Sequence, residues 1–184
     1  MSDRPILIVP GLFDSPADHW QSLWLESMPD ARRVEQENWE QPTLAEWTAG
    51  LVEALRSAPD AVLVGHSLGC ALIAHVAKIR GARGIAGAML VAPAEVNREG
   101  PVGRLLEPFG PMPMEPLPFP STVVASRNDP FVSFPEAARC AVSWGSRFVD
   151  LGDAGHINVE SGFGPWPEGR VILDELLARI EMRA

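Results

Sequence analysis

Short apolar runs alternate with longer amphipathic segments along nearly the whole chain, and no other feature restricts its fold as strongly. Such alternation is typical of strands and helices arranged around a parallel β-sheet. Six runs are candidate strands, at residues 6–9, 32–35, 61–64, 85–91, 122–125 and 147–151, of which the second is short and polar. We therefore predict an α/β fold with a mostly parallel six-stranded sheet and helices on both faces.

Helix signals lie between these runs. Helical patterning covers residues 18–26, 43–57, 68–79 and 171–182. Thr43 precedes Glu46 by three residues, and Ser133 precedes Glu136 by the same distance, which is the spacing of a capping box. Pro135 follows closely after Ser133 and is expected at the first position of a fifth helix, where its missing N–H costs nothing.

No repeat, low-complexity tract or linker divides the sequence, so residues 1–184 are expected to form one domain. One segment departs from the alternation. Residues 93–120 contain eight prolines, which are excluded from helix interiors and central strands. We expect this segment to be mostly irregular.

Composition narrows the class of protein. The chain is 46% hydrophobic and 21% charged, which is ordinary globular usage. Its formal net charge of -9 repels phosphate backbones and anionic lipid headgroups, so neither nucleic acid nor a membrane is an expected partner. No apolar run approaches the length of a membrane span or a signal-peptide core, and we expect a cytoplasmic protein. Cys70 and Cys140 lack the spacing of metal ligands and are expected to be buried free thiols.

The segment Gly65-His66-Ser67-Leu68-Gly69 is the strongest chemical motif. It follows an apolar run and precedes a helical pattern, which is the strand-turn-helix context that a GxSxG nucleophile elbow requires. Such a turn presents the serine hydroxyl at the carboxyl end of the sheet, next to a helix N-terminus that favours a developing oxyanion. Ser67 is therefore the candidate nucleophile. The alternative is a glycine-rich turn in which Ser67 only caps the helix.

A serine nucleophile needs a histidine base, and four histidines are available. His66 adjoins Ser67 and is expected to point elsewhere, while His75 and His19 lie within helical patterns. His156 follows the last strand, in the loop Gly152-Asp153-Ala154-Gly155-His156, where ligands gather in open α/β folds. It is the candidate base, with an ordinary surface-loop histidine as the alternative.

Asp129 is the candidate acid that orients this histidine. It follows the strand at 122–125 and lies between Ser67 and His156 in sequence, which is the chain order of α/β-hydrolases. Asp150 and Asp153 are competitors, and a turn residue before proline is the structural alternative. The Leu68 N–H and one N–H from Pro10-Gly11-Leu12-Phe13, with Leu12 as the candidate, are expected to form the oxyanion hole.

With these motifs the sequence resembles the small serine hydrolases related to retinoblastoma-binding protein nine and their bacterial relatives. The matching segments are Pro10-Gly11 with Asp14-Ser15-Pro16 and His19-Trp20-Gln21, Gly65 to Gly69, Asn128-Asp129-Pro130-Phe131, Gly155-His156-Ile157-Asn158, and Ser161-Gly162-Phe163-Gly164-Pro165-Trp166-Pro167. The resemblance implies a minimal α/β-hydrolase. It also implies a cofactor-free enzyme with Ser67, Asp129 and His156 as its triad, and it supplies no substrate.

Aromatic residues are candidates for substrate binding. Trp166, His19 and Trp20 could line the mouth of the site, although tryptophan is more often a core residue. Phe109, Met112 and Met114, within residues 93–120, are candidate apolar lining, with an ordinary surface loop as the alternative. Because that segment is too short for a helical cap, an open site of limited depth is expected.

Hydrolysis of carboxylic esters with small acyl groups, through an acyl-enzyme, is the predicted function. The expected partner is a small-molecule acyl substrate, and the oligomeric state is left open. Amide or aminoacyl-ester hydrolysis is the enzymatic alternative, and a haloperoxidase-like or lyase reaction shares the same residues. A protein-binding module with an idle triad is the alternative from another class.

Overall fold

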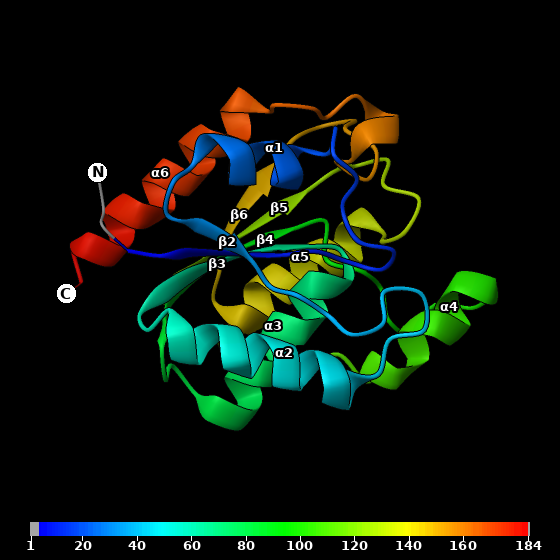
Figure 1. The fold of residues 1–184 in the computed structure, drawn as a ribbon. Coiled ribbons are helices and arrows are strands. Elements are labelled where there is room, and N and C mark those ends of the chain that lie inside the picture. Colours follow the sequence, from blue (N-terminus) through cyan, green and yellow to red (C-terminus); the bar gives the residue numbers. More distant parts are fainter. Residues whose placement is uncertain (1–3, 184) are drawn as a thin grey trace.

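A six-stranded parallel sheet forms the centre of the computed structural model, which describes residues 4–183 (Figure 1). The strand order is β2-β1-β3-β4-β5-β6, and every adjacent pair is parallel. The strands are β1 (Ile6–Val9), β2 (Ala31–Arg33), β3 (Ala61–His66), β4 (Ile85–Val91), β5 (Ser121–Ala125) and β6 (Arg147–Asp150). The predicted fold class is confirmed.

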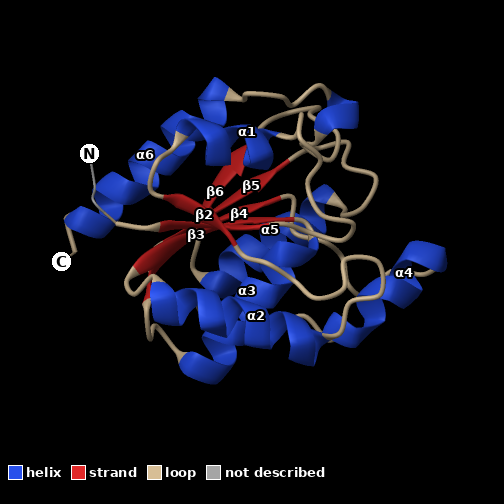
Figure 2. Ribbon diagram, in the orientation of Figure 1, coloured by secondary structure: helices blue, strands red, loops and turns tan. Residues whose placement is uncertain are grey.

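Helices cover both faces of this sheet, as Figure 2 shows. On one face lie α1 (Trp20–Ser27) and α6 (Pro167–Glu181), and on the other α2 (Leu44–Ser57), α3 (Leu68–Arg80) and α5 (Phe134–Trp144). Each layer encloses its own cluster of buried apolar side chains against the sheet. Strands buried on both faces are the reason that β3 and β4 appear in the sequence as nearly continuous apolar runs.

The second strand is shifted from its predicted position. Residues 32–35 were the expected strand, whereas β2 comprises Ala31–Arg33 and pairs only with β1. Val34 still donates its N–H to the carbonyl oxygen of Ile8, but Glu35 lies beyond the ladder. An edge strand has one partner rather than two, so its ends depend on that partner's length more than on its own polar sequence.

At each predicted capping box the N-cap hydroxyl accepts from the N–H three residues further on, which is the hydroxyl half of the box. The Thr43 hydroxyl accepts from the Glu46 N–H at 3.3 Å and donates to the Glu46 carboxylate at 2.7 Å, at the start of α2. Ser133 accepts from the Glu136 N–H at 3.3 Å and starts α5, where Pro135 is the second helical residue rather than the first.

The last helix begins earlier than residue 171. It starts at Pro167, with Trp166 as its N-cap, because a proline needs no N–H acceptor in the first turn.

The proline-rich segment is less irregular than predicted. It contains the short helix α4 (Pro101–Leu106) and the 3₁₀ turn η1 (Glu107–Phe109), which projects with α4 beside the sheet (Figure 1). Pro101 is the first residue of α4 and Pro108 the second of η1, and both positions tolerate a missing N–H. The prolines therefore begin these turns rather than prevent them.

Within residues 4–183, no helix is both long enough and apolar enough to cross a bilayer.

Candidate active site

A strained turn between β3 and α3 carries Ser67. Its φ of 53° and ψ of -118° lie in a region that side chains rarely adopt. The turn is held in place because the Ser67 N–H donates to the Val91 carbonyl at 3.0 Å, and the Ser67 carbonyl accepts from Cys70 at 3.0 Å and Ala94 at 3.2 Å. Strain that the surrounding bonds enforce in this way is typical of a nucleophile elbow.

Glycines make this turn possible. A Cβ on Gly65 would lie 2.7 Å from the Ile73 side chain, and one on Gly69 would lie 2.2 Å from the Val9 carbonyl oxygen. The start of α3 can thus contact the end of β1 directly through backbone atoms. This contact places the loop after β1 against the turn that holds Ser67.

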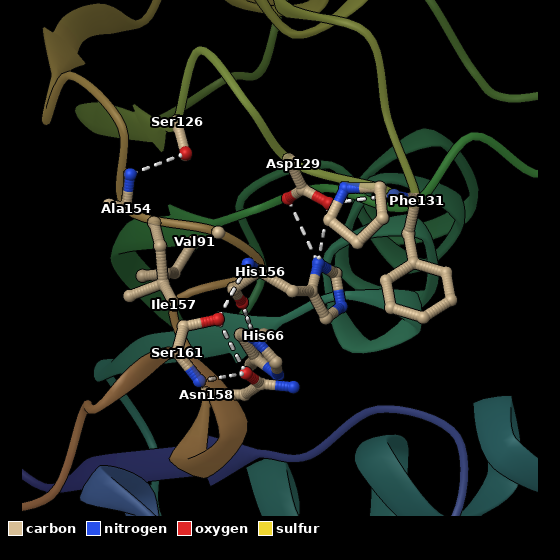
Figure 3. A network of polar contacts seen from close by, with 12 residues as sticks. His66, Val91, Ser126, Asp129, Phe131, Ala154, His156, Ile157, Asn158 and Ser161 are labelled. Atoms are coloured by element: carbon tan, nitrogen blue, oxygen red, sulfur yellow. Dashed lines mark hydrogen bonds and ion pairs between the residues drawn. The ribbon is translucent and has the colours of Figure 1, made fainter.

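His156 and Asp129 meet at the carboxyl end of the sheet (Figure 3). The His156 Nδ1 lies 3.0 Å and 2.9 Å from the two carboxylate oxygens of Asp129, whose side chain is fully buried. One of these oxygens also accepts from the Phe131 N–H at 2.8 Å. Because a carboxylate accepts, Nδ1 carries the proton and Nε2 is left with a free lone pair.

The backbone around His156 is held by side chains from neighbouring loops. Ser126 accepts from the Ala154 N–H at 2.9 Å, and Asn128 accepts from the Gly155 N–H at 2.7 Å. The His156 N–H donates to the Ser161 hydroxyl at 3.0 Å, and Figure 3 shows Ser126 and Ser161 near the histidine. The loop position of His156 is therefore fixed without regular secondary structure.

His66 is part of the site, which corrects the expectation that it points elsewhere. Its Nε2 lies 2.9 Å from the His156 carbonyl oxygen, so Nε2 is the donor and the elbow is bonded directly to the histidine loop. Burial, followed by the proximity of His156 and His19, lowers the pKa of His66 well below its usual value. His66 is thus a neutral hydrogen-bond donor near pH 7.

His19 also lies beside the site. It is the N-cap of α1, where its Nδ1 accepts from the Gln21 N–H at 3.2 Å, and its ring centroid is 5.0 Å from that of His66. Burial, and secondarily His156, lowers the pKa of His19 to about 4.

Ser67 and His156 line the same cleft, which has a volume of about 350 Å³. Apolar side chains form much of its wall, namely Leu12, Phe13, Pro16, Ala94, Val102, Leu106, Phe131 and Val159. The polar lining includes His19, His66, Asn158 and two carboxylates, Asp14 and Glu160. No lysine or arginine lines this cleft within the described chain.

The predicted oxyanion donors flank the serine. A Cβ on Gly11 would lie 2.9 Å from the Ser67 Cβ and 3.2 Å from the Leu68 nitrogen, so the loop that carries Leu12 is in contact with the elbow. Leu68 is the first residue of α3, and its N–H has no acceptor within the helix. In the region 4–183, the Leu12 N–H has no hydrogen-bond acceptor in the protein.

Trp20 and Trp166 were expected to line the mouth of the site, and the structure contradicts this. Trp20 is fully buried and Trp166 is 5% exposed, with ring centroids 5.1 Å apart in the core between the sheet and α6. The Trp20 Nε1 donates to the Ile157 carbonyl at 2.9 Å, so Trp20 supports the histidine loop from behind. Large aromatic rings with their N–H satisfied gain most from full burial.

The apolar lining expected from residues 93–120 also differs. Phe109 and Met112 are buried in the core, and Met114 packs against it, whereas Val102 and Leu106 of α4 line the cleft. These two, together with Phe13 and Phe131, were not predicted as cleft lining. Phe13 had a usable signal, because it follows the predicted oxyanion donor directly in the loop after a strand.

Cys70 lies one helical turn after Ser67 and is not a rival nucleophile. Its thiol is fully buried and lies 3.3 Å from the Val91 carbonyl oxygen. Burial raises the pKa of the Cys70 thiol well above its usual value, which keeps it protonated.

A strained serine at the end of a central strand, in the same cleft as an aspartate-bound histidine, agrees with the family model that matches the sequence. Residues 6–175 match the model described as serine hydrolase. The chain belongs to the serine hydrolase family. As such it is a hydrolase of the α/β-hydrolase fold.

This serine hydrolase is similar to several solved structures. A putative YdeN-like hydrolase from Pectobacterium atrosepticum is 40% identical, with a TM-score of 0.86 over 96% of this chain and 91% of the other. The ydeN gene product of B. subtilis is 23% identical, with a TM-score of 0.80 over 95% and 99%. A thermophilic esterase from Thermogutta terrifontis, 17% identical, has a TM-score of 0.67 over 97% and 91%. No curated protein matches this sequence.

Proposed function

We propose that this serine hydrolase cleaves carboxylic esters with small acyl groups, using Ser67 as nucleophile, His156 as general base and Asp129 as the acid that orients it. The observation that carries the proposal is the Asp129–His156 pair, at 2.9 Å and 3.0 Å, in the same cleft as a strained serine. The bond orients the imidazole and directs its free Nε2 lone pair away from the carboxylate. It also stabilises the imidazolium that forms during the reaction.

The proposed reaction has two halves. The Ser67 oxygen forms a bond to the ester carbonyl carbon while its proton passes to His156 Nε2, and the carbonyl electron pair becomes an oxyanion that the Leu12 and Leu68 N–H groups hold. The oxyanion collapses, the bond to the leaving oxygen breaks, and His156 returns the proton to that oxygen. Water then repeats the sequence on the acyl-enzyme, giving the carboxylic acid and free Ser67.

The size and lining of the cleft support a small, largely apolar acyl group. A volume of about 350 Å³ is near the lower end of small-molecule sites, and most of the lining side chains are apolar. The short α4 contributes Val102 and Leu106 at one wall, in place of a cap domain. The proposed substrate is therefore a small-molecule acyl ester. Since the net charge of -9 disfavours nucleic acid and anionic membranes, we propose that the enzyme acts on it in the cytoplasm.

A covalent probe tests the nucleophile. The purified protein, Ser67→Ala and Ser133→Ala are each incubated with a fluorophosphonate and weighed intact by mass spectrometry. We expect one adduct on the wild type and on Ser133→Ala, whose serine is an exposed helix cap, and none on Ser67→Ala. A folded wild-type protein that stays unlabelled would favour the protein-binding alternative and contradict the proposal.

A substrate series tests the ester preference. Nitrophenyl esters from acetate to octanoate and the matching nitroanilides are compared by kcat/KM. We expect the short esters to be the best substrates, with activity falling once the chain exceeds the cleft. Faster cleavage of the anilides would instead establish an amide hydrolase.

A further inference from the structure

Gln21 is a fully buried polar side chain in the first turn of α1, and the mechanism above gives it no role. Its helix, α1, covers the same face of the sheet as α6 (Figure 1). A buried amide is costly unless its donors and acceptor are satisfied, so its partners are informative.

Both ends of this amide are bonded. The Gln21 Nε2 donates to the Val64 carbonyl at 3.1 Å and to the Val9 carbonyl at 3.4 Å. The Gln21 Oε1 accepts from the Ser15 hydroxyl at 2.7 Å. Two carbonyls on one side and a hydroxyl on the other determine which amide atom is nitrogen.

The two carbonyls belong to the strands that carry the catalytic groups. Val9 ends β1 and stands three residues before Leu12, and Val64 in β3 stands three residues before Ser67. Val9 pairs with Gly65 in the last register position of the ladder between these strands. Gln21 therefore bonds both strands at the point where their own ladder ends.

Beyond this point the loops after β1 and β3 remain close together. A Cβ on Gly11 would lie 3.0 Å from the His66 carbonyl oxygen and 3.2 Å from the Leu68 nitrogen, and one on Gly69 would lie 2.2 Å from the Val9 carbonyl oxygen. The separation of the Leu12 and Leu68 N–H groups depends on how the ends of β1 and β3 are held. An oxyanion is stabilised only by donors at about 2.7–3.1 Å, so a small shift in either strand end matters.

We propose that Gln21 is a positioning residue for the oxyanion hole, which sets the spacing of the Leu12 and Leu68 N–H groups by bonding the ends of β1 and β3 with one amide. The Ser15 hydroxyl orients the amide by donating to the Gln21 Oε1. The inference rests on the proposed function, because it assumes that these two N–H groups hold an oxyanion.

The test replaces Gln21 with methionine, which has similar length and volume but no donor. We expect kcat/KM for a short nitrophenyl ester to fall by about 10- to 100-fold, since misplacing a group by 1 Å costs about 10²-fold. KM is expected to change little, because ground-state binding does not use the oxyanion hole. Rates are normalised to the fraction of protein that a fluorophosphonate labels at completion.

A transition-state analogue separates positioning from general support of the fold. An alkyl trifluoromethyl ketone forms a bond to the Ser67 oxygen, and its carbonyl becomes an oxyanion in the hole. We expect its inhibition constant to rise by the same factor as kcat/KM falls in Gln21→Met. Thr122→Val is the matched control, because it also removes one buried polar group. The Thr122 hydroxyl accepts from Arg179 at 3.2 Å near the N-terminal end of β5, whereas the site lies at the carboxyl end of the sheet. Thr122→Val is expected to lower Tm and leave both constants unchanged.

Each outcome decides the proposal. A folded Gln21→Met with wild-type kcat/KM and ketone inhibition overturns the inference and leaves the proposed function standing. If Gln21→Met does not fold, Ser15→Ala decides, with an expected change of about threefold in both constants; unchanged constants overturn the inference. A wild-type protein that neither hydrolyses esters nor binds the ketone overturns the proposed function and the inference with it.

Discussion

Asp129 and His156 are 27 positions apart in the chain, and their contact is made by two loops that leave adjacent strands, β5 and β6. The rival acids have other partners. Asp150 is paired with Arg127, which lowers the pKa of the Asp150 carboxyl, and Asp153 is exposed. At this scale the structure brings one carboxylate to the histidine and turns the others to the surface.

Replacing Asp129 with asparagine is expected to lower kcat by about 10⁴-fold, by analogy with the serine-protease template. An amide offers an N–H to Nδ1 and favours the tautomer that protonates Nε2, which then cannot accept the serine proton. Steady-state kinetics and thermal unfolding measure the two effects, and the fold is expected to persist. Asp150→Asn is the control and should keep wild-type turnover; a loss there, with activity kept in Asp129→Asn, would reassign the acid.

The buried histidines predict how stability depends on pH. Burial lowers the pKa of His19 to about 4 in the folded protein, against 6.5 for an unperturbed histidine, and lowers that of His66 in the same direction. Between these values the unfolded chain binds more protons than the folded one. The free energy of unfolding should therefore fall as the pH drops from about 6.5 towards 4.

Urea unfolding from pH 7.5 to 4.5 measures this slope. His19→Asn keeps an N-cap acceptor but removes a titrating group, so its stability should fall less steeply, by up to about one proton. An unchanged slope in this variant would mean that His19 is protonated in the folded state.

Strand ends and turns, rather than single side chains, position the reacting groups. The elbow after β3 carries Ser67, the loop after β5 carries Asp129, the loop after β6 carries His156, and the loop after β1 carries Leu12. All four loops leave the carboxyl edge of one parallel sheet, where ligands gather in this class of fold. The elbow contacts the loop after β1 directly, and it bonds to the histidine loop through His66.

Gly11→Ala is expected to damage catalysis more than stability. The added Cβ would lie 2.9 Å from the Ser67 Cβ and 3.0 Å from the His66 carbonyl oxygen, so the loop that carries Leu12 must move away from the elbow. A shift of this kind should lower kcat/KM by about 10²-fold. Gly164→Ala is the control, because its Cβ would meet nothing closer than 3.9 Å. Equal activity in the two variants would contradict the predicted loop contact.

Charge acts at the scale of the whole molecule. The chain carries a formal net charge of -9, and the cleft adds the Asp14 and Glu160 carboxylates without a lining lysine or arginine among the residues described. Asp14 is paired with Arg33, whereas Glu160 is exposed at the rim. The field at the cleft should thus repel anionic substrates before they reach Ser67.

Esters of neutral acids should be hydrolysed faster than hemisuccinate esters of similar length, with the difference largest at low ionic strength. Glu160→Gln should raise kcat/KM for the hemisuccinate several-fold and leave the neutral ester unchanged. The measurement is kcat/KM for both esters at low and high salt. A preference for the anionic ester would contradict this prediction.

Much of the architecture could be predicted because its signals are local. The spacing of apolar residues indicated the strands and the helices that cover the sheet. The capped starts of α2 and α5 were indicated by residues three positions apart, because a cap is a hydrogen bond within one helical turn. The edge strand β2 was placed one residue too late and the helix α4 was not predicted, because their limits depend on a partner strand and on packing. The triad roles of Ser67, Asp129 and His156 stay predictions that the geometry supports.

By itself the sequence determined the GxSxG elbow, the order of Ser67, Asp129 and His156 along the chain, and the end of the sheet at which they gather. These features follow from strand alternation and glycine spacing, which are properties of consecutive residues. The tertiary structure alone decided that Trp20 and Trp166 are core, that His66 bonds to the His156 loop, and that Gln21 joins β1 to β3. The hydrogen bonds of Gln21 and His66 join residues separated by 12 to 90 positions. Their geometry follows from how helices pack on the sheet, which no local pattern encodes.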